Sequence, residues 1–460
     1  MNRKIPLIVI LVLLFCLTLA NALPQESGNS TGQASNEPLR VPVTVSSIEA
    51  LIPYLDDDNV KVRLAPGTYN IDKNDSVAKN PIFCISGSNS TYDFTGATIN
   101  IDTDVLSAHG GVDYQHMVIV GNNSLIKNLK LIDDGSVYDR PGRRATNIAL
   151  EGRHNVIDGL YMETRGSWPY GYGDLFGKSS TYIIKHYKHS SLKLSGDYNT
   201  IRNCKVYHYA YGHGYVMQAA QNPTIENCYM EGEVRSTDEM LAETSGPAYD
   251  RDFMARGGRL KPGMMKSTGE EGIRAYNRGD CMINGKRVER GTDNITVKNT
   301  TVKYMRGGVT LTLSDGFKYV EGCTAIGCES GFKVGTGGKV VDCYGDCQYG
   351  PVFAVDYTHD KGIPVDITMM PYSGEHVNYR KHMARIIGGD HNVTIRGVES
   401  NPDQDLKFFV GGDDNVVNNL TNYPMELSSG SSNNSGQSRG SITDNGSKNS
   451  VEKLKTWIKD

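Results

Sequence analysis

The segment Ile201-Arg-Asn-Cys204 and its copy Ile225-Glu-Asn-Cys228, which begins 24 residues later, decide the fold. Each consists of a β-branched residue, any residue, then Asn, Asp or Gly, and then a small or apolar residue. A β-branched residue followed closely by Asn or Gly is typical of a short strand that ends in a turn. Nine copies occur along the chain, the other seven beginning at Ile126, Ile157, Val297, Val320, Val340, Ile395 and Val417.

The spacing of the copies predicts a solenoid. Four of the eight intervals are 20 to 24 residues, the length of one coil of short strands, and the longer intervals fit coils that carry insertions. Stacked coils would lie about 4.8 Å apart, so equivalent side chains would form columns. We therefore predict an all-β protein, a right-handed parallel β-helix. The fourth repeat position should form a buried column: Leu129, Leu160, Cys204, Cys228, Thr300, Cys323, Cys343, Val398 and Leu420.

The ends of the chain suggest export and a terminal extension. Residues 1–22 have a basic start, an apolar run and the sequence Ala20-Asn-Ala22, which together predict a secretory signal peptide and a secreted or periplasmic protein. A retained membrane anchor is the alternative. Residues 23–59 would form an N-terminal segment and cap, and residues 60–427 the β-helix. A flexible Ser/Asn/Gly-rich linker is expected at 428–450 and a short helix at 451–460.

Charge and cysteine content narrow the class of protein. The chain has 48 basic and 52 acidic residues, so no global field indicates nucleic acid as a partner. Eight of nine cysteines follow the predicted signal peptide, an even number that first suggests disulfides in an exported protein. Four of them occupy the predicted core column, where cysteine acts as a small apolar residue, and we expect these to be free.

The segment Val62-Arg-Leu-Ala-Pro-Gly-Thr-Tyr69 resembles the entry strand of pectin-lyase-like β-helices. With the repeat, it gives residues 60 to 425 an architecture similar to that superfamily, which contains polysaccharide lyases, glycoside hydrolases and epimerases. The resemblance implies a carbohydrate-active protein. It involves the architecture alone and no catalytic motif.

Two interruptions of the repeat are the expected place of function, because inserted loops build walls beside a stacked face. The larger covers about residues 229–292, and the other precedes Lys193. Between them lies Tyr207-His-Tyr-Ala-Tyr-Gly-His-Gly-Tyr215, and tyrosine and histidine stack on sugars and transfer protons. An aromatic ladder on the outside of a coil is the alternative interpretation.

Local charge suggests an acidic ligand. Residues 178–193 carry four lysines and two histidines without an acidic residue, whereas residues 226–243 carry six carboxylates and one arginine. We interpret the first segment as a cationic wall for an acidic glycan. Two solvated loops that pair with each other would give the same pattern.

Elimination from a uronic acid requires a cation against the carboxylate, a base for the C5 proton and an acid for the departing oxygen. The sequence predicts a lyase on a uronic-acid-containing poly- or oligosaccharide, or a dehydratase variant with water as the leaving group, as in some ulvan-degrading systems. The predicted catalytic residues are His208, His213, Tyr211 and Tyr215. The predicted substrate-binding residues are Lys193, Arg235, Lys266, Arg274 and Glu231.

Three alternatives remain open from the sequence. A glycoside hydrolase would need two carboxylates, with Glu231, Glu233, Asp238, Glu239, Glu270 and Glu271 as candidates. Neighbours on a strand point to opposite faces, so at most one residue of the Glu270-Glu271 pair should face a groove. An epimerase and a non-catalytic glycan-binding protein are also compatible with these residue types. No cofactor or metal site is predicted, although Asp250 and Asp252 offer oxygen ligands for Ca²⁺.

Overall fold

The computed structural model describes residues 42–109, 113–135, 144–166, 171–177, 188–255, 258–372, 374, 377–397, 403 and 405–455. The chain divides into residues 1–39 and 40–460, and every described residue belongs to the second unit. The predicted signal peptide and the segment 23–41 thus lie outside the described residues. None of the described helices is long and apolar enough to span a bilayer.

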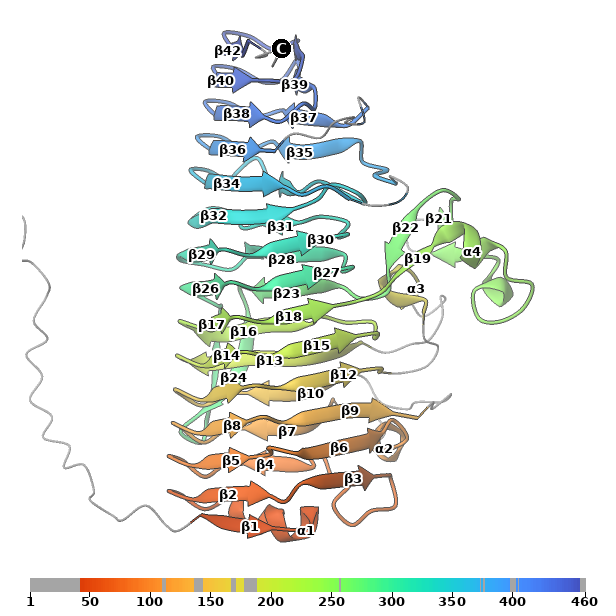
Figure 1. Cartoon of the computed structure of the whole chain (residues 1–460), viewed down its shortest axis with the longest axis vertical. Helices are drawn as coiled ribbons and strands as arrows, with labels where there is room; N and C mark the ends of the chain where they lie inside the picture. Colours follow the sequence, from red (N-terminus) through yellow and green to blue (C-terminus); the bar gives the residue numbers. More distant parts are fainter. Residues whose placement is uncertain are drawn as a thin grey trace, which may run out of the picture. The chain divides into compact units, whose positions relative to one another are not determined.

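Residues 42–455 form a parallel β-helix, as predicted, in which coils stack in chain order from the N-terminal to the C-terminal end (Figure 1). Before residue 338 a typical coil contributes one strand to a 13-stranded sheet, here sheet B, and two strands to a 23-stranded sheet, here sheet A. From residue 338 onward each coil contributes a single strand to sheet A. Sheet B consists of β4 (Phe83–Ile85), β7 (Tyr114–Ile119), β10 (Ala145–Leu150), β13 (His189–Asp197), β16 (Tyr215–Gln221), β23 (Glu271–Tyr276), β28 (Gly307–Leu313), β31 (Phe332–Lys333), β33 (Phe353–Val355), β35 (His382–Ile386), β37 (Lys407–Val410), β39 (Met425–Leu427) and β41 (Ile442–Asp444).

Sheet A contains two parallel ladders. The first consists of β1 (Val43–Val45), β2 (Lys61–Leu64), β5 (Thr91–Asp93), β8 (Leu125–Lys127), β11 (Val156–Asp158), β14 (Thr200–Arg202), β17 (Thr224–Glu226), β26 (Ile295–Lys298), β29 (Lys318–Glu321), β32 (Gly338–Gly345), β34 (Pro364–Met369), β36 (Asn392–Arg396), β38 (Val416–Leu420), β40 (Ser435–Ser438) and β42 (Ser450–Lys453). The second consists of β3 (Gly67–Ile71), β6 (Ala97–Asp102), β9 (Lys130–Asp134), β12 (Tyr161–Thr164), β15 (Lys205–His208), β18 (Tyr229–Glu231), β27 (Thr301–Lys303) and β30 (Thr324–Ile326), which pairs with β32. At the N-terminal end, α1 (Ile48–Leu51) and η1 (Ile52–Tyr54) follow β1, and Ile48 and Leu51 pack into the core.

The repeat unit marks the bend between the two ladders of sheet A. Its third residue has a left-handed backbone at Asn203 (φ 56°), Asn227 (φ 53°) and Gly159 (φ 78°). Only Gly, Asn and Asp adopt this conformation at low cost, which explains why these three residue types alternate there. The first repeat position aligns between coils, for example Ile157 with Ile201.

The predicted core column is confirmed from Leu129 to Cys343, whereas Leu420 is only half-buried and lies outside the core, and Val398 lies outside the described residues. Cys204, Cys228 and Cys323 lie in the main hydrophobic core beside Leu129 and Leu160. None of the eight cysteines of the described part is disulfide-bonded to another of them. Six fill the narrow interior as small apolar side chains, including the four of the column as expected, whereas Cys84 is exposed and Cys281 packs against the hairpin.

The prediction of a flexible linker at 428–450 and a helix at 451–460 is wrong for the described residues. Strands β40, β41 and β42 continue both sheets to residue 453. The Asn residues of this segment bend the chain and bond to the coil before, as Asn434 does with Asn415. A composition typical of linkers therefore encodes solenoid coils here. Residues 456–460 lie outside the described part.

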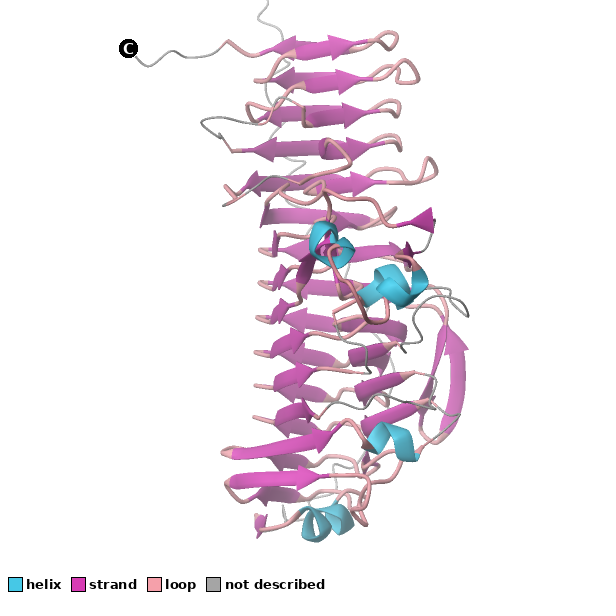
Figure 2. Ribbon diagram, turned by 90° about the vertical axis from the view of Figure 1, so that its right-hand side faces the viewer, coloured by secondary structure: helices cyan, strands magenta, loops and turns pink. Residues whose placement is uncertain are grey.

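The predicted insertion at 229–292 is two insertions, because β23 returns to sheet B between them. The first, residues 232–270, projects from one flank and contains β19 (Val234–Ser236), α4 (Thr237–Leu241), η2 (Tyr249–Arg251), β20 (Met254–Ala255), β21 (Gly258–Arg259) and β22 (Met265–Ser267) (Figure 1). It packs with α3 (Gly173–Gly177) around Phe176 and Met240. Figure 2 faces this flank and shows helices on it; α2 (Val105–Ala108) lies nearer the N-terminal end. The second insertion is the hairpin of β24 (Gly279–Ile283) and β25 (Lys286–Arg290).

Candidate functional site

Two hollows lie on the outer face of sheet B. The first, which we call the groove, has a volume of about 540 Å³, and its polar lining includes Lys188, Lys193, His213, Gln218, Tyr276 and Arg278. The second hollow, of about 220 Å³, is lined among others by Lys266, Glu271, Arg306, Lys333, Tyr379 and Arg380. Because β13, β16, β23 and β28 are consecutive strands of the sheet, the two hollows follow one another along the solenoid. Most of their charged side chains are cationic.

His213 is the centre of a polar cluster between the hollows. Its Nε2 atom lies 2.9 Å from the Tyr276 hydroxyl and 2.9 Å from the Lys188 ammonium. Its Nδ1 atom lies 3.1 Å from Oε2 of Glu271. Burial lowers the pKa of His213 below its usual value, against the opposing effect of the Glu270 carboxylate. The imidazole is therefore neutral near pH 7. Two donors at Nε2, Tyr276 and Lys188, and the Glu271 carboxylate at Nδ1 favour the proton on Nδ1, against the effect of the Glu270 carboxylate, which also lies next to Nε2.

Glu270 and Glu271 both contact His213, but only Glu271 lines a hollow, in agreement with the expectation that at most one of them would face a groove. Glu270 Oε2 lies 3.1 Å from His213 Nε2 and also pairs with Lys188. Glu271 pairs with Arg306 at 2.6 Å. Burial would raise the pKa of each carboxyl, but the neighbouring His213, Lys188 and Arg306 lower it, for Glu270 to about 2. Both can contact His213 because Glu270 precedes β23, so the strict alternation of a strand does not apply to the pair.

Arg274 lies on β23 between the two hollows and lines neither of them. In the register of sheet B it stands between Val216 of the groove and Thr310 of the second hollow. Its guanidinium carbon lies 4.6 Å from the centre of the Tyr276 ring, so the charge is held next to the phenol. Among the described residues it has no carboxylate partner, and its buried Nε has no hydrogen-bond partner. Burying a charged donor without a partner is costly, which indicates that a ligand oxygen completes this position.

Other cations occupy the same column of sheet B at every second coil. Lys193, Arg274, Lys333 and Arg385 all belong to it, since the register passes from one to the next through the intervening coils. Lys193 lies 3.6 Å from Glu151, and Lys333 lies 3.0 Å from Asp356. Within the described part, Arg274 is the member of this column that forms no salt bridge, although it is near enough to Glu271 to lower the pKa of that carboxyl.

His208 was predicted as a catalytic base, and the structure contradicts this role. The side chain is fully buried inside the coil, where Nδ1 lies 2.8 Å from Ser191 Oγ and Nε2 lies 3.0 Å from the Gly212 carbonyl. Burial lowers its pKa to about 4. Since the Gly212 carbonyl also accepts the backbone N–H of Glu270, His208 holds the turn that carries His213 rather than contacting a substrate.

The two tyrosines predicted as acids are not in the groove. Tyr215 is completely buried in the core, where burial and the thiols of Cys204 and Cys228 raise its pKa well above the usual value. Tyr211 is partly exposed but lines neither hollow. The phenol that reaches His213 belongs to Tyr276, which sequence reasoning missed because it assigned residues 229–292 to one loop.

The predicted substrate-binding residues are divided between several surfaces. Lys193 lies in the groove, and Lys266 lines the second hollow, where its ammonium is 2.7 Å from Glu329. Arg235 pairs with Glu243 in the projecting insertion, so its prediction as a groove residue is wrong. Glu231 is also misplaced, because it lies on the outer face of sheet A, in register with Tyr207 and Lys303. Of the predicted cationic wall, residues 178–187 lie outside the described part.

The cluster of His213, Glu270 and Glu271 has donor atoms close enough for a metal ion. Lys188 and Arg306 already supply positive charge to the two carboxylates, so a divalent cation would have to displace both pairs. Asp250 and Asp252, the candidate calcium ligands, lie on the exposed η2 turn, and Asp252 pairs with Arg259 at 3.3 Å. Neither arrangement favours a metal in the groove.

No protein-family model matches the chain, and no curated protein matches it significantly. Similar solved structures include the catalytic domain of a GH87 α-1,3-glucanase with nigerose (11% identity, 92% of this chain and 70% of that chain, TM-score 0.41). An alginate lyase, AlyF-OU02, in complex with G6 is 8% identical over 87% of this chain and 78% of its own (TM-score 0.42). The endo-xylogalacturonan hydrolase from Aspergillus tubingensis is 10% identical over 90% of this chain and 100% of its own (TM-score 0.36). At these values no activity follows from the similarity.

Proposed function

We propose that the protein is a carbohydrate-active enzyme that cleaves a carbon–oxygen bond of a uronic-acid-containing poly- or oligosaccharide by β-elimination. The observation that carries the proposal is Arg274, a cation without a carboxylate partner in the described structure, held 4.6 Å from the ring of Tyr276 beside His213. The carboxylate of a bound uronate would supply the missing partner of the Arg274 guanidinium. The C5 atom of that uronate would then lie near the phenol of Tyr276. The cations of both hollows favour the same acidic class of substrate.

The three side chains have distinct roles in this mechanism. Arg274 binds the substrate carboxylate and stabilises the negative charge that develops when C5 loses its proton. The Tyr276 oxygen takes that proton while its own passes to the neutral Nε2 of His213, 2.9 Å away. Glu271, 3.1 Å from Nδ1, orients the imidazole and stabilises its protonated form.

The electron pair of the broken C5–H bond forms the C4–C5 double bond as the C4–O bond breaks. The proton held by Tyr276 and His213 returns to the departing oxygen, so the enzyme ends unchanged. With a sugar as the leaving group the enzyme is a polysaccharide lyase. With a hydroxyl group, which leaves as water, it is an oligosaccharide dehydratase.

Glycoside hydrolysis fits this cluster less well. A hydrolase needs one carboxyl group that stays protonated to act as the general acid. Glu270 and Glu271 are the carboxylates that contact His213, and their cationic neighbours lower the pKa of both. Two ionised carboxylates supply no acid.

The test is incubation with pectin, alginate, ulvan and glycosaminoglycans, followed in parallel by ultraviolet absorbance and by release of reducing ends. Elimination gives an unsaturated product that absorbs, and His213→Ala should abolish it. Reducing ends without absorbance would identify a hydrolase and overturn the proposal. Absence of both signals on every acidic glycan, together with activity on a neutral glucan, would overturn it as well.

A further inference from the structure

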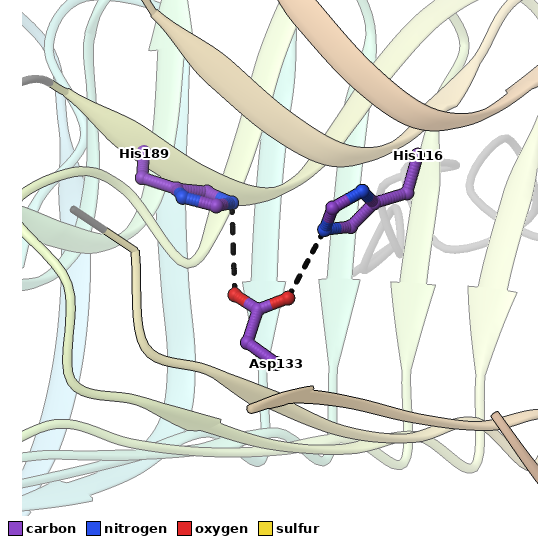
Figure 3. A group of neighbouring side chains, drawn as sticks. All are labelled: His116, Asp133 and His189. Carbon is purple, nitrogen blue, oxygen red and sulfur yellow. Dashed lines mark hydrogen bonds and ion pairs between the residues drawn. The ribbon is translucent and has the colours of Figure 1, made fainter. Parts of the chain in front are cut away.

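A second polar cluster lies inside the coils, beneath the groove floor. Asp133 at the end of β9 lies between His116 of β7 and His189 of β13 (Figure 3). Nε2 of His116 is 3.1 Å from Asp133 Oδ1, and Nε2 of His189 is 3.7 Å from Oδ2. All three side chains are at least 98% buried.

Hydrogen bonding to Asp133 does not account for the position of His189. The Asp133 carboxylate is already satisfied, because Oδ1 accepts from His116 and Asn147 and Oδ2 accepts from the backbone N–H of Arg165 at 3.0 Å. The separation of 3.7 Å between His189 and Asp133 is too long for a hydrogen bond. Two imidazole nitrogens nevertheless converge on one buried carboxylate.

The separations match those of ligands that share a metal ion. Zinc binds His nitrogen and Asp oxygen at about 2.0–2.2 Å, which places tetrahedral ligand atoms about 3.4 Å apart. The observed values of 3.1 and 3.7 Å bracket that separation, and all three donor atoms lie within 4.8 Å of one another. Nε2 of His189 hydrogen-bonds Oδ1 of Asn147, and a bound metal ion would replace this hydrogen bond, with Oδ1 available as a fourth oxygen ligand.

We propose that His116, Asp133 and His189 bind a divalent transition metal ion, and that the ion is zinc in a structural role. Two neutral imidazoles and a carboxylate suit zinc, whereas Ca²⁺ and Mg²⁺ prefer oxygen ligands alone. A redox or hydrolytic site keeps an open position for substrate. Here the cluster is sealed in the interior, which favours a closed structural site.

The ion would fix the floor of the groove. Tyr114 and Gln115, immediately before His116, line the groove, as does Ser190, immediately after His189. Metal bonds from β7, β9 and β13 would join successive coils at this point. Since the ligands are buried, the ion must enter during folding or local opening.

The experiment measures metal in the purified wild-type protein, independently of any enzymatic activity. We expect elemental analysis to find about one zinc ion per chain. Unfolding and refolding with a chelator should lower the melting temperature, and refolding with Zn²⁺ should restore it. Refolding with Co²⁺ should give the visible absorption bands of tetrahedral cobalt. Asp133→Asn should lower the bound metal by at least about tenfold.

The control is His391→Gln, which changes a buried histidine outside this cluster and should keep full metal content. The proposal is overturned if wild-type protein contains no metal and refolding with Zn²⁺ or Co²⁺ changes neither the melting temperature nor the spectrum. If Asp133→Asn does not fold, the wild-type measurements decide alone. If it binds metal as tightly as wild type, the ligand assignment is wrong.

Discussion

The Nε2 atom of His213 lies 2.9 Å from the phenol oxygen of Tyr276, although 63 positions separate the two residues in the chain. His213 lies two residues before β16 and Tyr276 ends β23, and these strands are neighbours in sheet B, where Tyr215 pairs with Ile273. The chain leaves the solenoid after β18, forms the insertion at 232–270 and re-enters the solenoid one coil further on. The pair therefore results from stacking across an insertion.

Tyr276→Phe tests the proposed proton transfer. It removes the hydroxyl but keeps the ring against Arg274, so we expect kcat to fall about 10²- to 10⁴-fold with little change in substrate affinity. Initial rates from product absorbance and affinities from calorimetry separate the two effects. Tyr344→Phe, at a side chain 43% exposed on sheet A, is the control. A kcat within about threefold of wild type would exclude Tyr276 as the group that moves the proton.

Arg274→Gln tests the recognition of a carboxylate. Loss of one charge-assisted hydrogen-bonding partner should weaken binding of an acidic oligosaccharide by about 2 kcal/mol, or about thirtyfold, and reduce the salt dependence of binding. Arg274→Lys should recover part of the affinity because it restores charge without the bidentate geometry. The control Arg287→Gln changes an exposed arginine on the hairpin. Equal affinity of Arg274→Gln and wild type would refute a uronate contact here.

The buried His208 makes stability depend on pH. Its pKa is about 4 in the folded protein and 6.5 in the reference state, because burial disfavours the charged imidazole. Between these values the unfolded chain binds the proton more strongly, so acidification favours unfolding. We expect His208 alone to lower the free energy of unfolding by about 2 kcal/mol from pH 7 to pH 5.

Urea titrations of wild type and His208→Gln at both pH values measure this effect. The variant should lose less stability on acidification than wild type does. His391→Gln is a matched variant, because burial also lowers the pKa of His391 to about 4, and it should reduce the pH dependence without affecting activity. An unchanged pH dependence in His208→Gln would show that His208 is not held neutral in the fold.

The sequence predicted the β-helix because the repeat unit encodes local geometry. Asn203 and Asn227 have left-handed backbones at the bend, and Cys204 and Cys228 point into the core one residue later. Both features recur in each coil and need no long-range information. Glu163, Tyr207 and Glu231 are likewise in register between successive coils.

The candidate site was predicted only in part, for a physical reason. The sequence pointed to His213, Lys193 and Arg274 because their residue types suit the proposed chemistry. Tyr276 was not predicted, because no copy of the repeat unit lies next to β23 to mark it as a strand of the solenoid. Tyr215 faces inward because the preceding turn sets which face each residue of β16 takes. That turn is held by His208, four residues before Gly212, and by Glu270 from the next coil, and the second contact could not be read from local sequence.

An asparagine ladder stabilises the last coils, where composition suggested a linker. The Asn434 side chain accepts from the backbone N–H of Asn415 at 3.0 Å and donates to the Gly412 carbonyl at 2.9 Å. It also donates to Asn449 at 3.0 Å. One buried amide therefore joins three successive coils.

Asn434→Ala leaves the Asn415 backbone N–H and the Gly412 carbonyl without these partners. We expect the free energy of unfolding of the terminal coils to fall by about 2 kcal/mol, since several buried polar groups lose hydrogen bonds. In a solenoid each coil contacts only its neighbours, so hydrogen exchange should accelerate in residues 407–455 and remain unchanged near the groove. Asn445→Ala, at an exposed position of the same segment, should have no effect. Rapid exchange of residues 435–453 already in the wild type would instead indicate that this segment behaves as the linker its composition suggested.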